Sequence, residues 1–154
     1  MRRKDREITD QNAIQQIFQD AFVCHLAMVD DGKPYIVPLN FVYHDGAIIV
    51  HSAKNGRKVD ILKKNPQVCF QLETTNPNIV RNGEQPCDWG TSYRSIIGYG
   101  TAEILDSNED KIQALNAFVR RFDAGNHTFP ASEVQATTVI RIKIDSLTAK
   151  AANT

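Results

Sequence analysis

The sequence predicts a mainly β fold, a six-stranded antiparallel barrel with about three flanking helices. Three observations lead to this prediction. Short strand-like stretches follow one another closely and are joined mostly by turn-forming residues. Residues 140–145 alternate between isoleucine and charged residues, which is typical of a strand with one buried face. Three other segments repeat apolar residues at helical spacing instead.

The first part of the chain predicts a helix followed by a meander of three strands. Thr9 or Asp10 is placed to cap the helix. The Asp-Gly pair at 31–32 predicts a tight hairpin, and residues 44–46 predict the next turn. Pro38 interrupts the middle strand and favours an edge or a bulge there. The apolar residues of the helix are Ile14, Ile17, Phe18 and Ala21, and the strands are expected at residues 22–29, 35–43 and 47–51.

The second part predicts two more helices and three more strands. A helix is expected at residues 56–64, ended by Asn65-Pro66 because proline disfavours a helical residue before it. Ser107 with Asp110 gives a capping signal for the third helix, whose apolar residues run from Ile112 to Phe122. Residues 74–90, rich in Asn, Pro and Gly, are expected to form a long loop. The remaining strands are expected at residues 68–73, 92–105 and 140–145, with residues 123–136 irregular.

Composition indicates one domain over residues 1–154 and excludes several functional classes. Basic and acidic residues number 18 each, so no overall field favours nucleic acid or an anionic membrane. The charged start has no apolar run behind it, so a signal peptide is not expected, and no apolar stretch approaches the ~20 residues of a membrane helix. The odd number of cysteines, 3, is typical of reduced thiols in a cytoplasmic protein.

The most informative stretch runs from strand to helix through residues 50–58. Gly56 lets a ligand approach the backbone closely, and the start of a helix leaves several N–H donors unpaired. Lys54, Arg57 and Lys58 gather at the helix end where the macrodipole disfavours cations. A bound phosphate would make that arrangement favourable. The alternative is a solvated basic helix end, relieved by Asp60.

Two further stretches suit a ligand surface. Pro38 lies within residues 34–41, where freed backbone groups would suit the edge of a flat heterocycle, although an edge strand is the simpler interpretation. Trp89 and Tyr93 suit a ligand surface or a subunit contact, or else they belong to the core. No spacing typical of a zinc site or a serine hydrolase is present, so no metal site is expected. His51 is the one histidine beside the candidate phosphate loop, unless it serves only to close the strand.

Together these stretches resemble the pyridoxamine 5′-phosphate oxidase-like flavoproteins, particularly the branch of the 5-nitroimidazole-resistance proteins. The likeness extends from the first residue to about Leu105. The matching segments are residues 1–8, 34–38, 51–53, 56–58, 65–66, 87–89 and 93–100.

The resemblance implies a split β-barrel that forms a homodimer with FMN at the subunit interface. It implies that Arg57 and Lys58 hold the phosphate beside Gly56, and that His51 lies near the cofactor as the catalytic candidate. Ser95 would approach the cofactor from a neighbouring strand, and the resemblance does not assign that strand to one subunit or the other. The other implied cofactor-binding residues are Ser52 and Ala53 at the ribityl chain, and Val37, Pro38, Leu39 and Asn40 at the edge of the flavin ring. Vitamin B6 oxidation itself is not expected, because a C-terminal segment of the true oxidases has no counterpart here.

The function expected from these residues is an FMN-dependent oxidoreductase. It would pass electrons from a reduced nicotinamide or another donor to a small acceptor such as a nitroaromatic. A non-catalytic flavin-binding or sensing module would use the same phosphate site. The sequence also leaves open a carrier of a small apolar molecule and a haem-binding split barrel, whose axial ligand would be His25, His44, His51 or His127.

Overall fold

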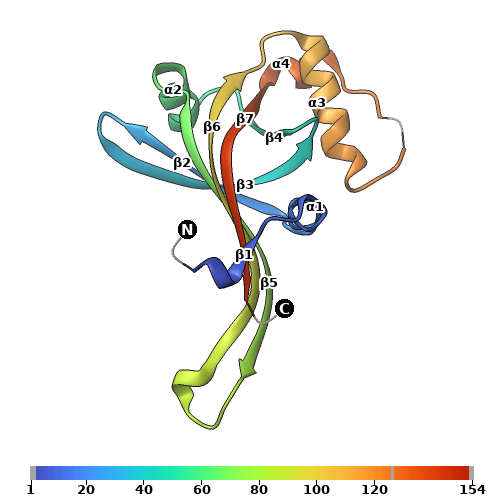
Figure 1. Ribbon diagram of the computed structural model, residues 1–154. Coiled ribbons are helices and arrows are strands. Elements are labelled where there is room, and N and C mark those ends of the chain that lie inside the picture. The colour runs from blue at the N-terminus through green and yellow to red at the C-terminus, as the bar shows by residue number, and fades with distance from the viewer. Residues whose placement is uncertain (1–2, 126, 153–154) are drawn as a thin grey trace.

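The computed structural model describes residues 3–125 and 127–152, with the backbone alone described at 75–78. Within these residues the strands form one antiparallel sheet in the order β1-β7-β4-β3-β2-β5-β6 (Figure 1). The strands are β1 Glu7–Ile8, β2 Val23–Asp30, β3 Lys33–His44, β4 Ala47–Ala53, β5 Gln67–Arg81, β6 Trp89–Ile104 and β7 Thr137–Ala152. The helices are α1 Gln11–Asp20, α2 Arg57–Lys64, α3 Asn108–Arg120 and α4 Ala131–Ala136, with 3-10 turns η1 Lys4–Arg6 and η2 Pro86–Asp88.

A pairing between β6 and β7 closes the sheet into a barrel. The closed ring is β7-β4-β3-β2-β5-β6, and the two-residue β1 is added at one end of β7. The predicted mainly β fold, an antiparallel split barrel with flanking helices, is therefore confirmed. The predicted meander is also confirmed, since β2 pairs with β3 and β3 with β4.

The barrel is split between β3 and β4. Along Lys33–Asn40, β3 pairs with β2, and it pairs with β4 only from Phe41 to His44. Beyond Val50, β4 pairs with β7 alone. Residues 33–40 of β3 and 51–53 of β4 therefore diverge, and we call the opening between them the β3–β4 fork.

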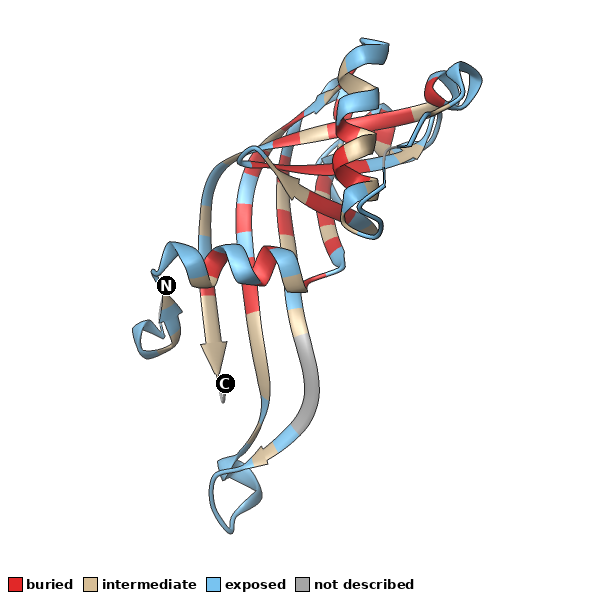
Figure 2. Cartoon of the chain, turned by 90° about the vertical axis from the view of Figure 1, so that its right-hand side faces the viewer, coloured by how far each residue is buried: buried red, intermediate tan, exposed pale blue. Residues whose placement is uncertain are grey.

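Two apolar clusters hold this arrangement. The larger fills the barrel, where α1 packs across β3, β5 and β6 with Ile14, Ile17 and Phe18 buried (Figure 2). Of the two predicted caps, Thr9 and Asp10, it is the Asp10 carboxylate that caps α1, with Oδ1 accepting from the Asn12 N–H at 2.7 Å. The smaller cluster joins α3 to the outer side of β3, β4 and β7 through residues that include Phe118 and Val139. Ser107 caps α3, also as predicted.

The prediction of a long loop at residues 74–90 is wrong. β5 continues to Arg81 and β6 begins at Trp89, so most of this segment is a two-stranded ribbon that extends away from the barrel (Figure 1). The ladder shifts register between Asn76 and Ile79 and then resumes. Such a bulge lets turn-forming residues lie inside a strand, which is why their composition was misleading.

Two smaller expectations also need correction. The segment 123–136, expected to be irregular, contains the short helix α4, which begins after Pro130 and buries Val134. The last strand is longer than 140–145, because β7 continues to Ala152 past a register irregularity near Gly100 of β6. Met1 and Arg2, part of the resemblance, lie outside the described residues. In the described part of the chain, no helix combines the length and apolar character needed to cross a membrane.

Candidate functional site

The corner between β4 and α2 presents unpaired backbone donors. β4 ends at Ala53 and α2 begins at Arg57, after Gly56. Gly56 has φ 149°, a conformation that side chains disfavour, and the space where its Cβ would lie is open. Its carbonyl accepts the first helical bonds from Val59 and Asp60, and no side chain caps the helix. The first N–H groups of α2 are thus available to an anion.

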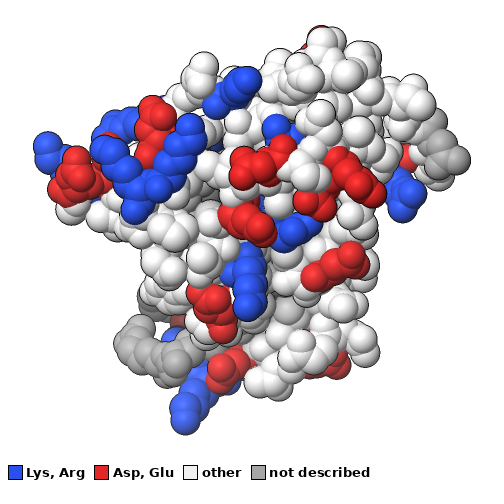
Figure 3. Space-filling view, turned by 90° about the horizontal axis from the view of Figure 1, so that it is seen from above, with Lys and Arg blue, Asp and Glu red and all other residues white. Residues whose placement is uncertain are grey.

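The predicted cations lie at this corner. Figure 3 shows Lys and Arg side chains gathered over α2, at the left of the view, with acidic atoms among them. Lys54 and Arg57 are exposed. Lys58 is half-buried, and burial lowers the pKa of its ammonium group. The carbonyl of Lys54 accepts a hydrogen bond from the buried Thr138 hydroxyl at 3.3 Å, which ties the connection to β7.

Arg57 has two partners from outside the corner. Its Nε lies 3.2 Å from Oδ2 of Asp30, at the end of β2. Its guanidinium lies over the Tyr35 ring on β3, 4.4 Å from the ring centroid. The sequence predicted that Asp60 would offset the positive charge at this helix end. In the described ion pairs the partner of Arg57 is Asp30 instead. Sequence reasoning missed both partners, since neither is near Arg57 in the sequence.

His51 lies on β4 opposite Val139 of β7. Its ring meets Phe118 of α3 edge to face, with centroids 4.6 Å apart. The residue is exposed overall, yet this contact shields part of the ring. Burial, and secondly the charge of Lys58, lower the pKa of His51 from its ordinary value of 6.5. The imidazole is therefore mostly neutral at neutral pH, with one nitrogen able to accept a proton.

The other predicted residues line the β3–β4 fork. Val37 and Leu39 turn toward the core, whereas Pro38 and Asn40 are exposed on the outer side. On this stretch the described strands pair with β3 on its β2 edge only, so the backbone groups on the other edge face the fork. Ser52 and Ala53 form the opposite side, where the Ser52 hydroxyl donates to the Ala53 carbonyl at 3.0 Å.

Ser95 is not part of this assembly within one chain. It is buried on β6 and pairs with Lys150 of β7, whereas Ser52 pairs with Thr138. Thr138 and Lys150 lie near opposite ends of β7, which separates Ser95 from the corner. The structure therefore brings residues 37–40 and 51–58 to one fork and leaves Ser95 apart.

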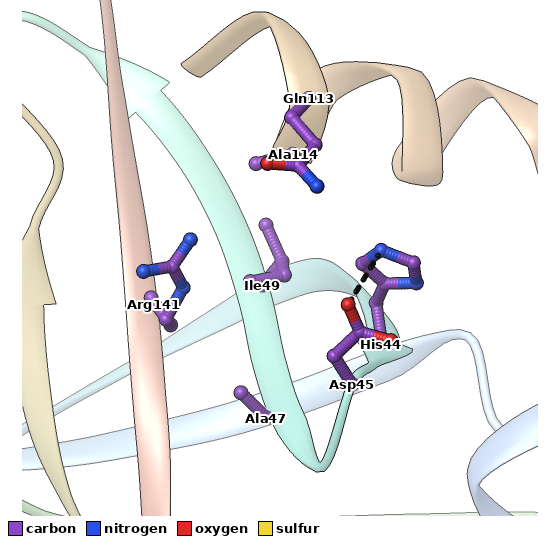
Figure 4. Close-up of a pocket in the computed structure, with 7 residues that line it drawn as sticks. All are labelled: His44, Asp45, Ala47, Ile49, Gln113, Ala114 and Arg141. Carbon is purple, nitrogen blue, oxygen red and sulfur yellow. Dashed lines mark ion pairs between the residues drawn. The ribbon is translucent and has the colours of Figure 1, made fainter. Parts of the chain in front are cut away.

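One cavity of about 270 Å³ lies between the β2–β3 turn and α2 and is lined by Asp30, Ile61 and Lys64. Two others lie away from the corner. One of about 390 Å³ opens between α3 and the β3–β4 turn, where His44 is 3.4 Å from Asp45 (Figure 4). A second, of about 480 Å³, shares His44 and is lined also by Tyr43, Arg120 and Arg121. Neither of these two includes residues of the fork. Among the described residues, no group of His, Cys, Asp and Glu is gathered to hold a metal ion.

Fold and corner together define a class, the antiparallel split β-barrels with a cationic strand-to-helix corner beside an open strand edge. The sequence matches the pyridoxamine 5′-phosphate oxidase family over residues 10–151, and the chain belongs to that family. This confirms the resemblance inferred from the sequence. No curated protein matches the sequence.

Solved structures show the same fold. A candidate 5-nitroimidazole antibiotic resistance protein from Bacteroides thetaiotaomicron is 27% identical, with a TM-score of 0.83 over 94% of this chain and 86% of that one. The flavocytochrome Anf3 from Azotobacter vinelandii is 20% identical, with a TM-score of 0.87 over 100% of this chain and 72% of that one. The FAD and haem binding protein from Mycobacterium smegmatis is 19% identical, with a TM-score of 0.86 over 97% and 74%. At these identities the last two show the fold alone.

Proposed function

We propose that this protein binds FMN in the β3–β4 fork and acts as an oxidoreductase. One observation carries the proposal: Arg57, Lys58 and the open N–H groups of α2 lie beside a β3 edge that has no strand partner in the described part of the chain. An anion and a flat polar heterocycle are the two ligand parts that such a site satisfies. FMN joins both in one molecule.

The residues present fit each part of FMN. Arg57 would contact the phosphate with its planar fork of donors and Lys58 as a point charge, while Gly56 leaves room for the phosphate to reach the backbone. Ser52 and Ala53 would line the ribityl chain. The free backbone edge of Val37, Pro38, Leu39 and Asn40 would meet the polar rim of the ring.

Bound flavin would supply the electron-transfer chemistry. The chain would fix its orientation through the corner and the β3 edge. His51, kept mostly neutral by its surroundings, would take or return a proton at an imidazole nitrogen. With 18 basic and 18 acidic residues, the chain exerts little steering on a charged substrate, so the fork's shape would select a small acceptor such as a nitroaromatic.

We further propose that the protein works as a homodimer. The outer face of β3, β2, β5 and β6 carries Ile36, Ala27, Cys69 and Tyr99 in register, with Ile36 60% and Tyr99 61% exposed. His25 lies on the same face, and its Nδ1 is buried without a hydrogen-bond partner among the described residues. A second copy would cover this apolar surface and would bring its own Ser95 toward the fork.

The proposed location is the cytoplasm. Three free cysteines, Cys24, Cys69 and Cys87, favour it, because thiols stay reduced there.

Turnover separates an enzyme from a flavin-binding module. Purified protein loaded with FMN is mixed with NADH or NADPH and a nitroaromatic acceptor, and nicotinamide oxidation is followed by absorbance. We expect oxidation that depends on the acceptor and exceeds that of free FMN at the same concentration. Bound FMN without such turnover by either nicotinamide would favour the sensing or carrier module instead.

A further inference from the structure

Arg57 is held in one orientation by two residues of the β2–β3 hairpin. Asp30 ends β2 and Tyr35 lies two residues into β3, across the turn formed by Asp31 and Gly32. Asp30 accepts the Nε–H of Arg57 at 3.2 Å, and the Tyr35 ring lies under the guanidinium at 4.4 Å. The Asp30 side chain is only 24% exposed, whereas that of Arg57 is 56% exposed.

These contacts leave the binding end of Arg57 available. Of the five N–H donors of a guanidinium, the Asp30 carboxylate takes the one on Nε. Tyr35 covers one flat face of the Arg57 guanidinium, so it occupies none of the N–H donors, which point outward in the guanidinium plane. The Nη groups at the far end are the pair that contacts a phosphate side by side.

The contacts are poorly suited to stabilising the fold. An ion pair with a half-exposed arginine adds little to stability, because water and salt screen it. Fixing a long side chain before a ligand arrives does strengthen binding, since the loss of rotamer freedom is already incurred in the free protein. The observed geometry thus favours a role in binding over a role in folding.

We propose that Asp30 and Tyr35 are positioning residues that hold Arg57 ready for the phosphate of the cofactor. The inference rests on the proposed function and assigns these two residues to its site. It makes the end of the β2–β3 hairpin part of the phosphate site, although neither residue touches the phosphate. If Asp30 instead competed with the phosphate for Arg57, removing the charge of Asp30 would tighten FMN binding rather than weaken it.

The test compares FMN with riboflavin, which has the same ring without the phosphate. Cofactor-free protein is titrated with each flavin, and binding is followed by flavin fluorescence. Asp30→Asn keeps the shape and removes the charge, so we expect the Kd for FMN to rise about tenfold while that for riboflavin is unchanged. Asp30→Glu should recover part of the loss. Asp31→Asn, one residue away in the turn at φ 49°, is the matched control and should change neither Kd.

Tyr35 provides the second arm of the test. Tyr35→Phe keeps the ring and should keep FMN affinity, whereas Tyr35→Leu should weaken FMN selectively. Unfolding midpoints of the cofactor-free variants show whether a loss of binding is a loss of folding, which would weaken both flavins alike.

The outcomes are distinguishable. If the unsubstituted protein prefers FMN but Asp30→Asn leaves that preference unchanged, or tightens FMN binding, this inference is overturned and the proposed function stands. If the unsubstituted protein does not prefer FMN over riboflavin, both are overturned.

Discussion

The ring of His51 meets the ring of Phe118 edge to face, with centroids 4.6 Å apart and planes at 85°. This contact connects the end of β4 to α3 and places a titratable group beside the cationic corner. Because burial and Lys58 both act against the charged imidazole, the folded chain favours neutral His51.

The first prediction concerns the pKa of His51. It should lie below the ordinary value of 6.5 in the folded protein, and Lys58→Met should raise it by removing a nearby cation. NMR titration of the ring protons measures both values. A pKa at or above 6.5 in the unsubstituted chain would contradict the electrostatic description of this corner.

The same shift makes stability depend on pH. Between the folded-state pKa and 6.5 the unfolded chain binds more protons, so the contribution of His51 is fully present above 6.5 and is lost as pH falls through the folded-state pKa. His51→Gln should reduce this part of the pH dependence in urea unfolding.

The same substitution tests the proposed catalytic role. His51→Gln should lower turnover more than FMN affinity, whereas equal losses of turnover and affinity would make His51 a structural residue.

The second prediction concerns the phosphate. Replacing Arg57 and Lys58 together with Ala should weaken FMN binding by roughly 3–6 kcal/mol, since each charge-assisted contact contributes ~1.5–3 kcal/mol. Replacing Lys63 and Lys64 removes the same charge from the other end of α2 and is the control. Isothermal titration calorimetry measures both. Equal losses in the two double variants would mean that the corner acts through net charge rather than as a site.

The third prediction concerns the dimer. Tyr99→Glu places a charge on the exposed apolar face and should yield a monomer at micromolar concentration. Ile112→Glu, on the exposed side of α3 outside that face, should leave the dimer intact. Light scattering after size exclusion gives the mass. A monomeric unsubstituted protein with FMN fully bound would exclude the proposed arrangement.

The fourth prediction concerns the fold around the split. Arg121 donates to the carbonyls of Phe41 at 3.0 Å and Gln19 at 2.8 Å, so it links the end of α3 to β3 and to the C-terminus of α1. Arg121→Met leaves these carbonyls without their charged donor and should cost about 2–4 kcal/mol of unfolding free energy. Arg120→Met is the exposed neighbour and should cost less than about 0.5 kcal/mol. Urea unfolding compares them, and similar losses would show that Arg121 is no structural link.

Local features were predictable from the sequence. Ser107 and Asp10 cap helices a few residues away, so spacing identified Ser107 and narrowed the first cap to Thr9 or Asp10. Lys54, Arg57 and Lys58 are close in sequence, so their clustering needed no tertiary information. The ribbon at 74–90 was missed because Asn, Pro and Gly are typical of loops, while a bulged ladder accommodates them.

Long-range relationships were not predictable. Asp30 and Tyr35 reach Arg57 only because the β2–β3 hairpin extends past the start of α2, which depends on strand register and closure of the barrel. Within one chain Ser95 lies apart from the fork, because Ser52 and Ser95 pair with residues near opposite ends of β7, and only the proposed second copy would bring a Ser95 close to the fork. Sequence spacing contains neither kind of information.

The central claim is that the β4–α2 corner and the β3 edge hold FMN. The most direct measurement is the visible absorption spectrum of the purified protein, recorded before and after FMN is added and unbound ligand is removed. We predict paired flavin bands in the blue and near ultraviolet, retained at about one FMN per chain after removal of free ligand. A protein that retains no flavin, or that shows a single intense Soret band of haem instead, would contradict the claim.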